Sequence, residues 1–195
     1  MELLTCLNEE ELKRVKMVSL KKEQILFNEN DNCETIGIVI EGEVDIISYS
    51  FEGSEIVFNK LTSGMVFGNN LIFSKEPYYR GSVIAKTPSK VALIYKKDLL
   101  TLLKSNDVFL LNYLQKQSDT GKELNSKIKL LSLSNAEERF MYYLHINGER
   151  ITYRNVTQLA STLFLTRETL SRLLSRLVEE KKIIKKKNYI TKYKK

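Results

Sequence analysis

A change in hydrophobic pattern near residue 97 divides this chain into a strand-rich part and a helical part. Seven short β-like runs lie between residues 18 and 95, separated by turn-like groups such as NENDN, FEGS and KTPS. Six of the eight glycines fall between Gly37 and Gly81, where tight corners need unusual backbone angles. Short strands with this spacing predict an antiparallel barrel or jelly roll. The runs are 24–27, 36–40, 44–49, 55–61, 65–68, 82–86 and 90–95.

The segments on either side of the strands have helical patterns. Residues 2–16 predict a short helix, with leucines on one side and charges on the other. From about residue 98 the pattern is helical and contains an apolar seam with heptad spacing. We favour a helix that dimerises in parallel, because an apolar stripe beyond a finished barrel needs a partner. The alternative is a helix packed on its own barrel. The seam consists of Leu110, Leu114, Gln117, Gly121, Leu124, Ile128 and Leu131.

A third segment begins near Ser134, which can cap a new helix with Glu137 as its capping-box partner. We expect the hinge at Leu131–Ser134. Further helices are predicted over 135–148, 155–164 and 166–182, followed by a hairpin over 183–191. The expected fold class is therefore α+β, in three parts: an antiparallel β-roll over 1–97, a long dimerisation helix over 98–133 and a C-terminal winged helix-turn-helix over 134–195.

The excess positive charge lies in the last 62 residues. Residues 1–133 carry 17 Lys and Arg against 18 Asp and Glu, whereas residues 134–195 carry 14 against 6. A neutral body with a basic end is typical of a protein that binds nucleic acid. A solvated basic tail would have the same composition.

Residues 155–180 have the pattern of a helix-turn-helix. Ala160 is small where the two helices would touch, Leu165 is the apolar residue of the turn, and Thr166 is a good N-cap. Leucines form the buried face of the second helix, and polar residues on its other side begin within the turns that enter the major groove. The leucines are Leu170, Leu173, Leu174 and Leu177, and the polar residues are Arg167, Glu168, Ser171 and Arg172.

The run TRETLSR over 166–172 resembles the recognition helix of the Crp/Fnr family of transcription regulators, and the resemblance extends over nearly the whole chain. It implies that Arg172 reads a guanine edge as a bidentate donor and that Glu168 accepts from a cytosine amino group. Arg167 matches a second guanine-reading arginine of the cyclic-AMP branch, and Ser171 matches the fumarate-nitrate branch. Both branches imply an inverted repeat with TGA and TCA half-sites. The expected phosphate contacts are Thr166, Thr169, Lys185, Lys186 and Lys187.

One position departs from the family pattern. Phe164 stands where this family usually has Gly, just before the apolar residue of the turn. Two outcomes are open: the turn keeps a positive φ at a cost of roughly 1 kcal/mol, or the ring packs on the neighbouring helix while the turn relaxes.

The strand-rich part resembles a cyclic-nucleotide-binding domain. Its pocket departs from that pattern, because Asn69 occupies the position of the carboxylate that would hold the ribose, and Arg80 is displaced by one residue. These departures disfavour a cyclic nucleotide and leave another small anion or acid, or no effector. Asn30 replaces a corner Gly, and asparagine tolerates that conformation. The candidate effector pocket consists of Gly68, Asn69, Asn70, Arg80 and Ser82.

The small numbers of cysteine and histidine residues argue against iron–sulfur, haem and metal-enzyme chemistry. Cys6 and Cys33 are too few for an iron–sulfur cluster, and the only histidine, His145, lies outside the barrel, so neither haem nor a cupin-type metal enzyme is expected. A thiol sensor at either cysteine stays open. No signal peptide or apolar run long enough to span a membrane is visible, so a cytoplasmic protein is expected.

The expected function follows from these features together. We expect a non-enzymatic transcription regulator, acting as an activator, that binds double-stranded DNA as a homodimer and contacts RNA polymerase. The alternative is a cyclic-nucleotide-binding-like module that acts through protein–protein contacts.

Overall fold

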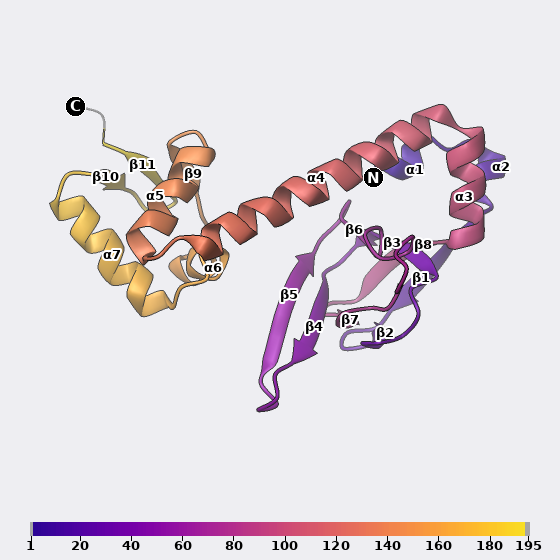
Figure 1. Ribbon diagram of the computed structural model, residues 1–195, viewed down its shortest axis with the longest axis horizontal. Helices are drawn as coiled ribbons and strands as arrows, with labels where there is room; N and C mark the ends of the chain where they lie inside the picture. The colour runs from indigo at the N-terminus through magenta and orange to yellow at the C-terminus, as the bar shows by residue number, and fades with distance from the viewer. Residues whose placement is uncertain (1, 194–195) are drawn as a thin grey trace. The chain divides into compact units, whose positions relative to one another are not determined.

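A computed structural model describes residues 2–193 (Figure 1). Lys194 and Lys195, which count toward the C-terminal charge excess, lie outside the described residues. The chain divides into two compact units, residues 1–120 and 121–195, and the boundary falls inside the long helix α4 (Asp107–Ser132).

The N-terminal segment contains two helical turns and a strand, so the prediction of one helix over 2–16 was wrong. Helix α1 (Glu2–Thr5) ends before Asn8, which begins α2 (Glu9–Leu12) with a capping box closed by Glu11. Strand β1 (Val15–Leu20) follows at once and pairs with β8 (Ser89–Tyr95). Its pairing partner lies far along the chain, so a local periodicity gave no sign of it.

Two four-stranded antiparallel sheets make up the strand-rich part. Their orders are β1-β8-β3-β6 and β2-β7-β4-β5. All seven predicted runs are strands, which confirms the antiparallel β-roll. The remaining strands are β2 (Ile25–Phe27), β3 (Thr35–Glu41), β4 (Val44–Tyr49), β5 (Glu55–Leu61), β6 (Val66–Phe67) and β7 (Ser82–Ala85).

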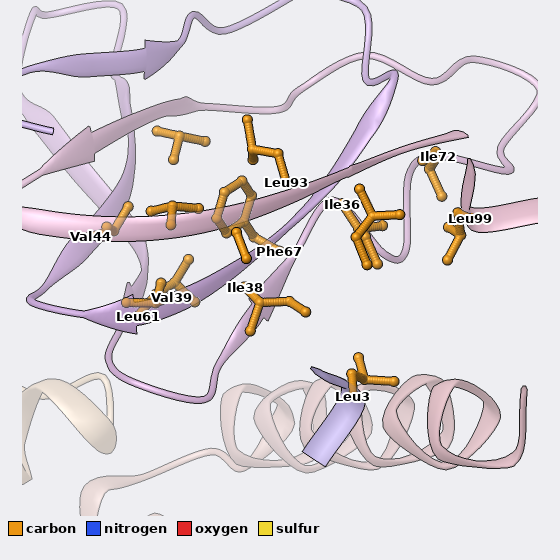
Figure 2. Close-up of a cluster of buried hydrophobic side chains, with 14 of the residues drawn as sticks. Leu3, Ile36, Ile38, Val39, Val44, Leu61, Phe67, Ile72, Leu93 and Leu99 are labelled. Carbon is orange, nitrogen blue, oxygen red and sulfur yellow. The ribbon is translucent and has the colours of Figure 1, made fainter. Parts of the chain in front are cut away.

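Side chains from both sheets fill the interior of the roll. Phe67 is 2% exposed and lies in the middle of the apolar cluster that Figure 2 shows. A Cβ atom on Gly37 would lie 1.9 Å from its ring, so only glycine fits there. The rings of Phe27 and Tyr79 stack with centroids 4.8 Å apart. Aromatic side chains of the chain itself therefore occupy the space between the sheets.

One corner of the roll tests a sequence prediction directly. Asn30 has a φ of 69°, and its N–H donates to the Tyr79 carbonyl at 2.8 Å. Asparagine thus supports the left-handed corner without glycine, as expected.

Two helices follow the roll. Asn106 separates α3 (Lys96–Ser105) from α4, and its side-chain oxygen accepts the Phe109 N–H at 2.9 Å. Phe109 and Tyr113 bury one face of α4 against the roll. Other apolar residues along α4 are exposed: Val108, Leu111, Leu114, Leu124, Ile128 and Leu131. Within residues 2–193, no helix has the length and apolar character needed to cross a membrane.

In its described residues, the C-terminal unit contains the end of α4, three further helices and a three-stranded sheet of order β10-β11-β9. The N-cap of α5 is Asn135, one residue later than the predicted Ser134, because the Asn135 side chain accepts the Glu138 N–H. Ser134 instead donates its hydroxyl to the Glu138 carboxylate at 3.0 Å. The sequence prediction also missed β9. The elements are α5 (Ala136–Ile146), β9 (Arg150–Thr152), α6 (Val156–Thr162), α7 (Arg167–Glu179), β10 (Ile183–Lys185) and β11 (Tyr189–Lys192).

Candidate nucleic-acid interface

Helix α7 has one face in the core of the C-terminal unit and one face toward solvent. Its four predicted core leucines are buried, as their spacing predicted: Leu170, Leu173, Leu174 and Leu177. Thr166 caps the helix, because its hydroxyl oxygen accepts the Thr169 N–H at 3.1 Å. The cap and the buried stripe together fix which side of α7 faces outward.

The outward side of α7 carries the side chains that were expected to read bases. All four are exposed: Arg167, Glu168, Ser171 and Arg172. Two expected phosphate contacts, Thr166 and Thr169, are also exposed at the start of this helix, and their hydroxyl oxygens are 2.9 Å apart. Charged donors, a carboxylate acceptor and hydroxyl groups therefore share one accessible helix face.

The turn between α6 and α7 has the hydrogen bonds of a Schellman motif. The Phe164 N–H donates to the Ser161 carbonyl at 3.2 Å, and the Leu165 N–H donates to the Ala160 carbonyl at 2.9 Å. Phe164 has a φ of 54° and a side chain that is 43% exposed. Of the two outcomes considered for this residue, the positive φ is the one present.

A basic cleft joins the start of α7 to the hairpin of β10 and β11. It has a volume of about 690 Å³ and is lined on one side by Arg167 and on the other by the three expected phosphate-binding lysines. All three lysines are exposed: Lys185, Lys186 and Lys187. The fold therefore brings together basic residues about 20 positions apart in the sequence.

Sequence reasoning missed the cleft residues 153–157, among them Arg154 and Thr157. These two flank Asn155, whose side chain accepts the Gln158 N–H at 2.8 Å and begins α6. The signal available in the sequence was a basic residue directly before an asparagine N-cap.

An ion-pair network lies near Arg172 on the α5 side. The Glu137 carboxylate accepts from Arg176 at 2.6 Å and from Lys182 at 2.7 Å. The hydrogen bond from Lys182 holds the pKa of Glu137 below its ordinary value of 4.5. Glu180 pairs with both of the same cations. Two of the positive charges near α7 are therefore held by carboxylates.

The candidate effector residues have partners within the protein. Asn69 is 4% exposed, and its amide group donates to the side chains of Gln117 and Thr120 on α4. Its backbone carbonyl accepts from Gln117 at 2.7 Å. The side chain of Asn69, which was expected to face an effector, is thus hydrogen-bonded to α4.

The other candidate effector residues lie in different environments. Arg80 is exposed, and its guanidinium nitrogen lies 3.9 Å from a Glu76 carboxylate oxygen. Ser82 accepts the Glu29 N–H at 3.0 Å. Gly68 is buried with a φ of 75°, and Asn70 is exposed.

The two thiols and the histidine lie in different environments. Cys33 is 1% exposed, and burial raises the pKa of its thiol above the ordinary value of 9.0. Cys6 is part-buried and donates to the Leu3 carbonyl, and His145 is exposed in the last turn of α5. Across residues 2–193, no group of three or more His, Cys, Asp or Glu side chains could hold a metal ion.

Comparison with known proteins agrees with this architecture. Residues 17–106 match the family model of the cyclic nucleotide-binding domain. No curated protein sequence matches the chain at a significant level.

Three solved regulators have the same fold at low identity. The Catabolite Activator Protein of Thermus thermophilus is 22% identical with a TM-score of 0.58, over 98% of this chain and 93% of that chain. FixK2 of Bradyrhizobium japonicum is 18% identical with a TM-score of 0.59, over 92% and 93%. A CooA mutant from Carboxydothermus hydrogenoformans is 19% identical with a TM-score of 0.72, over 100% and 91%.

Proposed function

The chain carries a cyclic nucleotide-binding domain and has the fold of the Crp/Fnr regulators, and on this premise we propose that it is a sequence-specific DNA-binding transcription regulator. The observation that carries the proposal is the outward face of α7, where Arg167, Glu168, Ser171 and Arg172 are all exposed beside a basic cleft. A recognition helix needs such donors and acceptors on its first turns to reach base edges. The solved neighbours are regulators rather than enzymes, which favours a non-enzymatic role.

Specificity and affinity have different sources in this proposal. Arg172 donates two hydrogen bonds to a guanine, Glu168 accepts from a cytosine, and the half-sites are TGA and TCA in an inverted repeat. The hydroxyls of Thr166 and Thr169 contact phosphates. The cleft with Arg154, Thr157 and the wing lysines binds the backbone without sequence preference.

A homodimer is the second part of the proposal. Ile128 is 64% exposed and Leu131 is 50% exposed on α4, so the described residues leave much of both side chains uncovered. A parallel pair of α4 helices would bury these residues. Dimerisation would also place two recognition helices to meet major grooves about 34 Å apart. The proposed division is a sensor barrel over 1–97, a dimerisation helix over 98–133 and a DNA-binding domain over 134–195.

An effector, if the roll binds one, is a small anion or acid other than a cyclic nucleotide. The bonds of Asn69 to α4 and the exposure of Arg80 support this part of the proposal, because Asn69 is already hydrogen-bonded to Gln117 and Arg80 lies at the surface near Glu76. No haem or iron–sulfur cluster takes part. We further propose a cytoplasmic activator that contacts RNA polymerase.

Fluorescence anisotropy on the ligand-free protein tests the function. An inverted repeat with TGA and TCA half-sites is compared with a scrambled duplex at about 0.15 M salt, where exposed charges are largely screened. Preferential binding to the repeat supports the proposal. Equal binding to both duplexes, persisting with a randomised DNA pool, contradicts it and favours a module that acts through protein contacts.

A further inference from the structure

One arginine of α5 reaches two other parts of the C-terminal unit. The Arg139 guanidinium group donates to the carbonyl of Leu133 at 3.2 Å through Nε, and to the carbonyl of Leu131 at 3.5 Å through Nη2. Its Nη1 atom donates to the carbonyl of Phe164 at 3.3 Å. A single half-buried side chain therefore joins the C-terminal end of α4 to the turn of the helix-turn-helix.

The two sites that Arg139 joins both need a partner. Leu131 lies in the last turn of α4, and Leu133 directly follows the helix. Carbonyl groups at the C-terminal end of a helix have no N–H donor within the helix. A cation at this end also interacts favourably with the helix dipole. Phe164 is held at a φ of 54°, a conformation that side chains with a Cβ adopt at a cost. The third hydrogen bond fixes the carbonyl of that residue.

Neighbouring contacts attach the end of α4 to the same unit. Leu130 is 4% exposed and belongs to the buried cluster that contains Phe140 and Leu163. The Lys129 ammonium group lies 4.7 Å from the centre of the Tyr142 ring. The last turn of α4 is thus packed on α5, and Arg139 extends this attachment to the turn before α7.

We propose that Arg139 is a positioning residue that ties the end of α4 to the helix-turn-helix turn and thereby sets where α7 lies relative to α4. The proposal rests on the proposed function, because this placement matters only if α7 enters DNA. It also changes the expected role of Leu131–Ser134. The hydrogen bonds of Arg139 bridge this segment, so it moves together with the recognition helix instead of acting as a free hinge.

Substitution of Arg139 by lysine separates the effect of the hydrogen-bond geometry of this side chain from the effect of its positive charge. Lysine keeps the positive charge but lacks the planar fork of N–H donors that reaches three carbonyl groups. Arg139→Lys should therefore weaken binding to the TGA/TCA repeat by at least about tenfold. Binding to a scrambled duplex should be unchanged, because the net charge is the same.

Arg150 provides a matched control in the same unit. It is exposed, and its guanidinium carbon lies 4.3 Å from the centre of the Tyr189 ring. Arg150→Lys should leave both affinities within about twofold of the wild type.

Amide hydrogen exchange provides a readout that needs no DNA. In Arg139→Lys the Leu165 amide, which donates to Ala160 in the turn after α6, should exchange faster. The Lys182 amide, which donates to Leu177 in the corresponding turn after α7, should keep its rate. An unchanged exchange rate at Leu165 would contradict the proposal that Arg139 holds the turn. Faster exchange at both amides would show that Arg139 stabilises the unit in general and not this turn in particular.

The two proposals fail in different ways. If the wild-type protein does not discriminate between duplexes, the DNA-binding function fails, while the exchange experiment still decides whether Arg139 holds the turn. If the wild type discriminates and Arg139→Lys discriminates equally well, the positioning role is wrong and the function stands.

Discussion

Asn69 and Gln117 bond to each other in both directions: the Asn69 amide group donates to the Gln117 side-chain oxygen, and the Gln117 amide group donates to the Asn69 backbone carbonyl at 2.7 Å. The Tyr113 hydroxyl donates to the same carbonyl at 3.3 Å. Burial raises the pKa of Tyr113 to about 12, so this hydroxyl keeps its proton and remains a donor at physiological pH. These bonds join the segment after β6 to α4 within the N-terminal unit.

Restoring a carboxylate at position 69 should therefore not create a cyclic-nucleotide site. In Asn69→Glu the new carboxylate cannot donate to the Gln117 oxygen, and a buried acceptor facing an acceptor costs about 1–3 kcal/mol. We expect a lower urea midpoint and no saturable heat on titration with cyclic AMP. Asn70→Glu, at the exposed neighbouring position, should leave the midpoint unchanged. Tight binding of cyclic AMP by Asn69→Glu would contradict the proposed pocket.

The two cysteines should react at different rates in the folded protein. Cys33 is 1% exposed, and its raised pKa keeps it in the unreactive thiol form at neutral pH. We expect iodoacetamide to modify Cys6 first and Cys33 only after unfolding in urea. Mass spectrometry of single Cys→Ser variants assigns the sites. Rapid modification of Cys33 in the folded protein would reopen the possibility of a thiol sensor there.

Removing the carboxylate of Glu137 should increase non-specific DNA binding. Its partners Arg176 and Lys182 then keep only Glu180, so Glu137→Gln should bind a scrambled duplex more tightly and steepen the salt dependence by about one charge. Glu179→Gln removes the same charge from an exposed position of α7 and serves as the control. An equal effect of both variants would indicate net charge rather than the ion-pair network.

The same carboxylate should contribute to stability in a pH-dependent way. The pKa of Glu137 is lower in the folded protein than its ordinary value of 4.5, mainly because Lys182 donates to it. The folded state therefore gains stability above the unfolded pKa and loses it as the pH falls through the folded pKa. Denaturation of Glu137→Gln should show a shallower loss of stability below about pH 5 than the wild type. An identical acid profile would contradict the lowered pKa.

Arg172 and Lys186 should differ in how they affect DNA binding. Arg172→Ala should cost about 1–3 kcal/mol on the TGA/TCA repeat and relax specificity at one base pair. Lys186→Ala should weaken binding to every duplex equally and reduce the salt slope by about 1. Anisotropy titrations over a salt series on both duplexes measure each effect. An Arg172→Ala protein with unchanged specific affinity would rule out base reading by this residue.

The sequence predicted those parts of the fold that local patterns specify. The leucines of α7 and the cap at Thr166 follow from helical spacing and N-cap chemistry, and both are present. The corner at Asn30 likewise depends on one residue. The antiparallel β-roll and the hairpin of β10 and β11 could be recognised because all their strands except β1 are short apolar runs bounded by turn residues.

Long-range partners account for what the sequence left undetermined. The start of β1 was assigned to a helix and the rest of the strand was missed, because its pairing with β8 joins residues about 75 positions apart. Arg154 and Thr157 were missed because only the folded wing brings lysines beside them. The bonds of Asn69 to α4 could not be foreseen either. An amide in place of the expected carboxylate indicates that the ribose contact is lost, but it does not indicate which groups the amide bonds instead.

A charge in the apolar seam of α4 should dissociate the proposed dimer. Ile128 is 64% exposed, and in a parallel pair of helices Ile128→Lys would bury two like charges against each other. We expect sedimentation velocity to show a shift toward monomer of at least about tenfold in the dimer dissociation constant. Specific DNA affinity should fall with it, because two half-sites are then bound by separate chains. Glu123→Lys introduces the same side chain at an exposed position outside the seam and should leave the dimer intact. A fully dimeric Ile128→Lys protein would place the interface elsewhere, because a seam through Ile128 could not hold two unpaired ammonium groups.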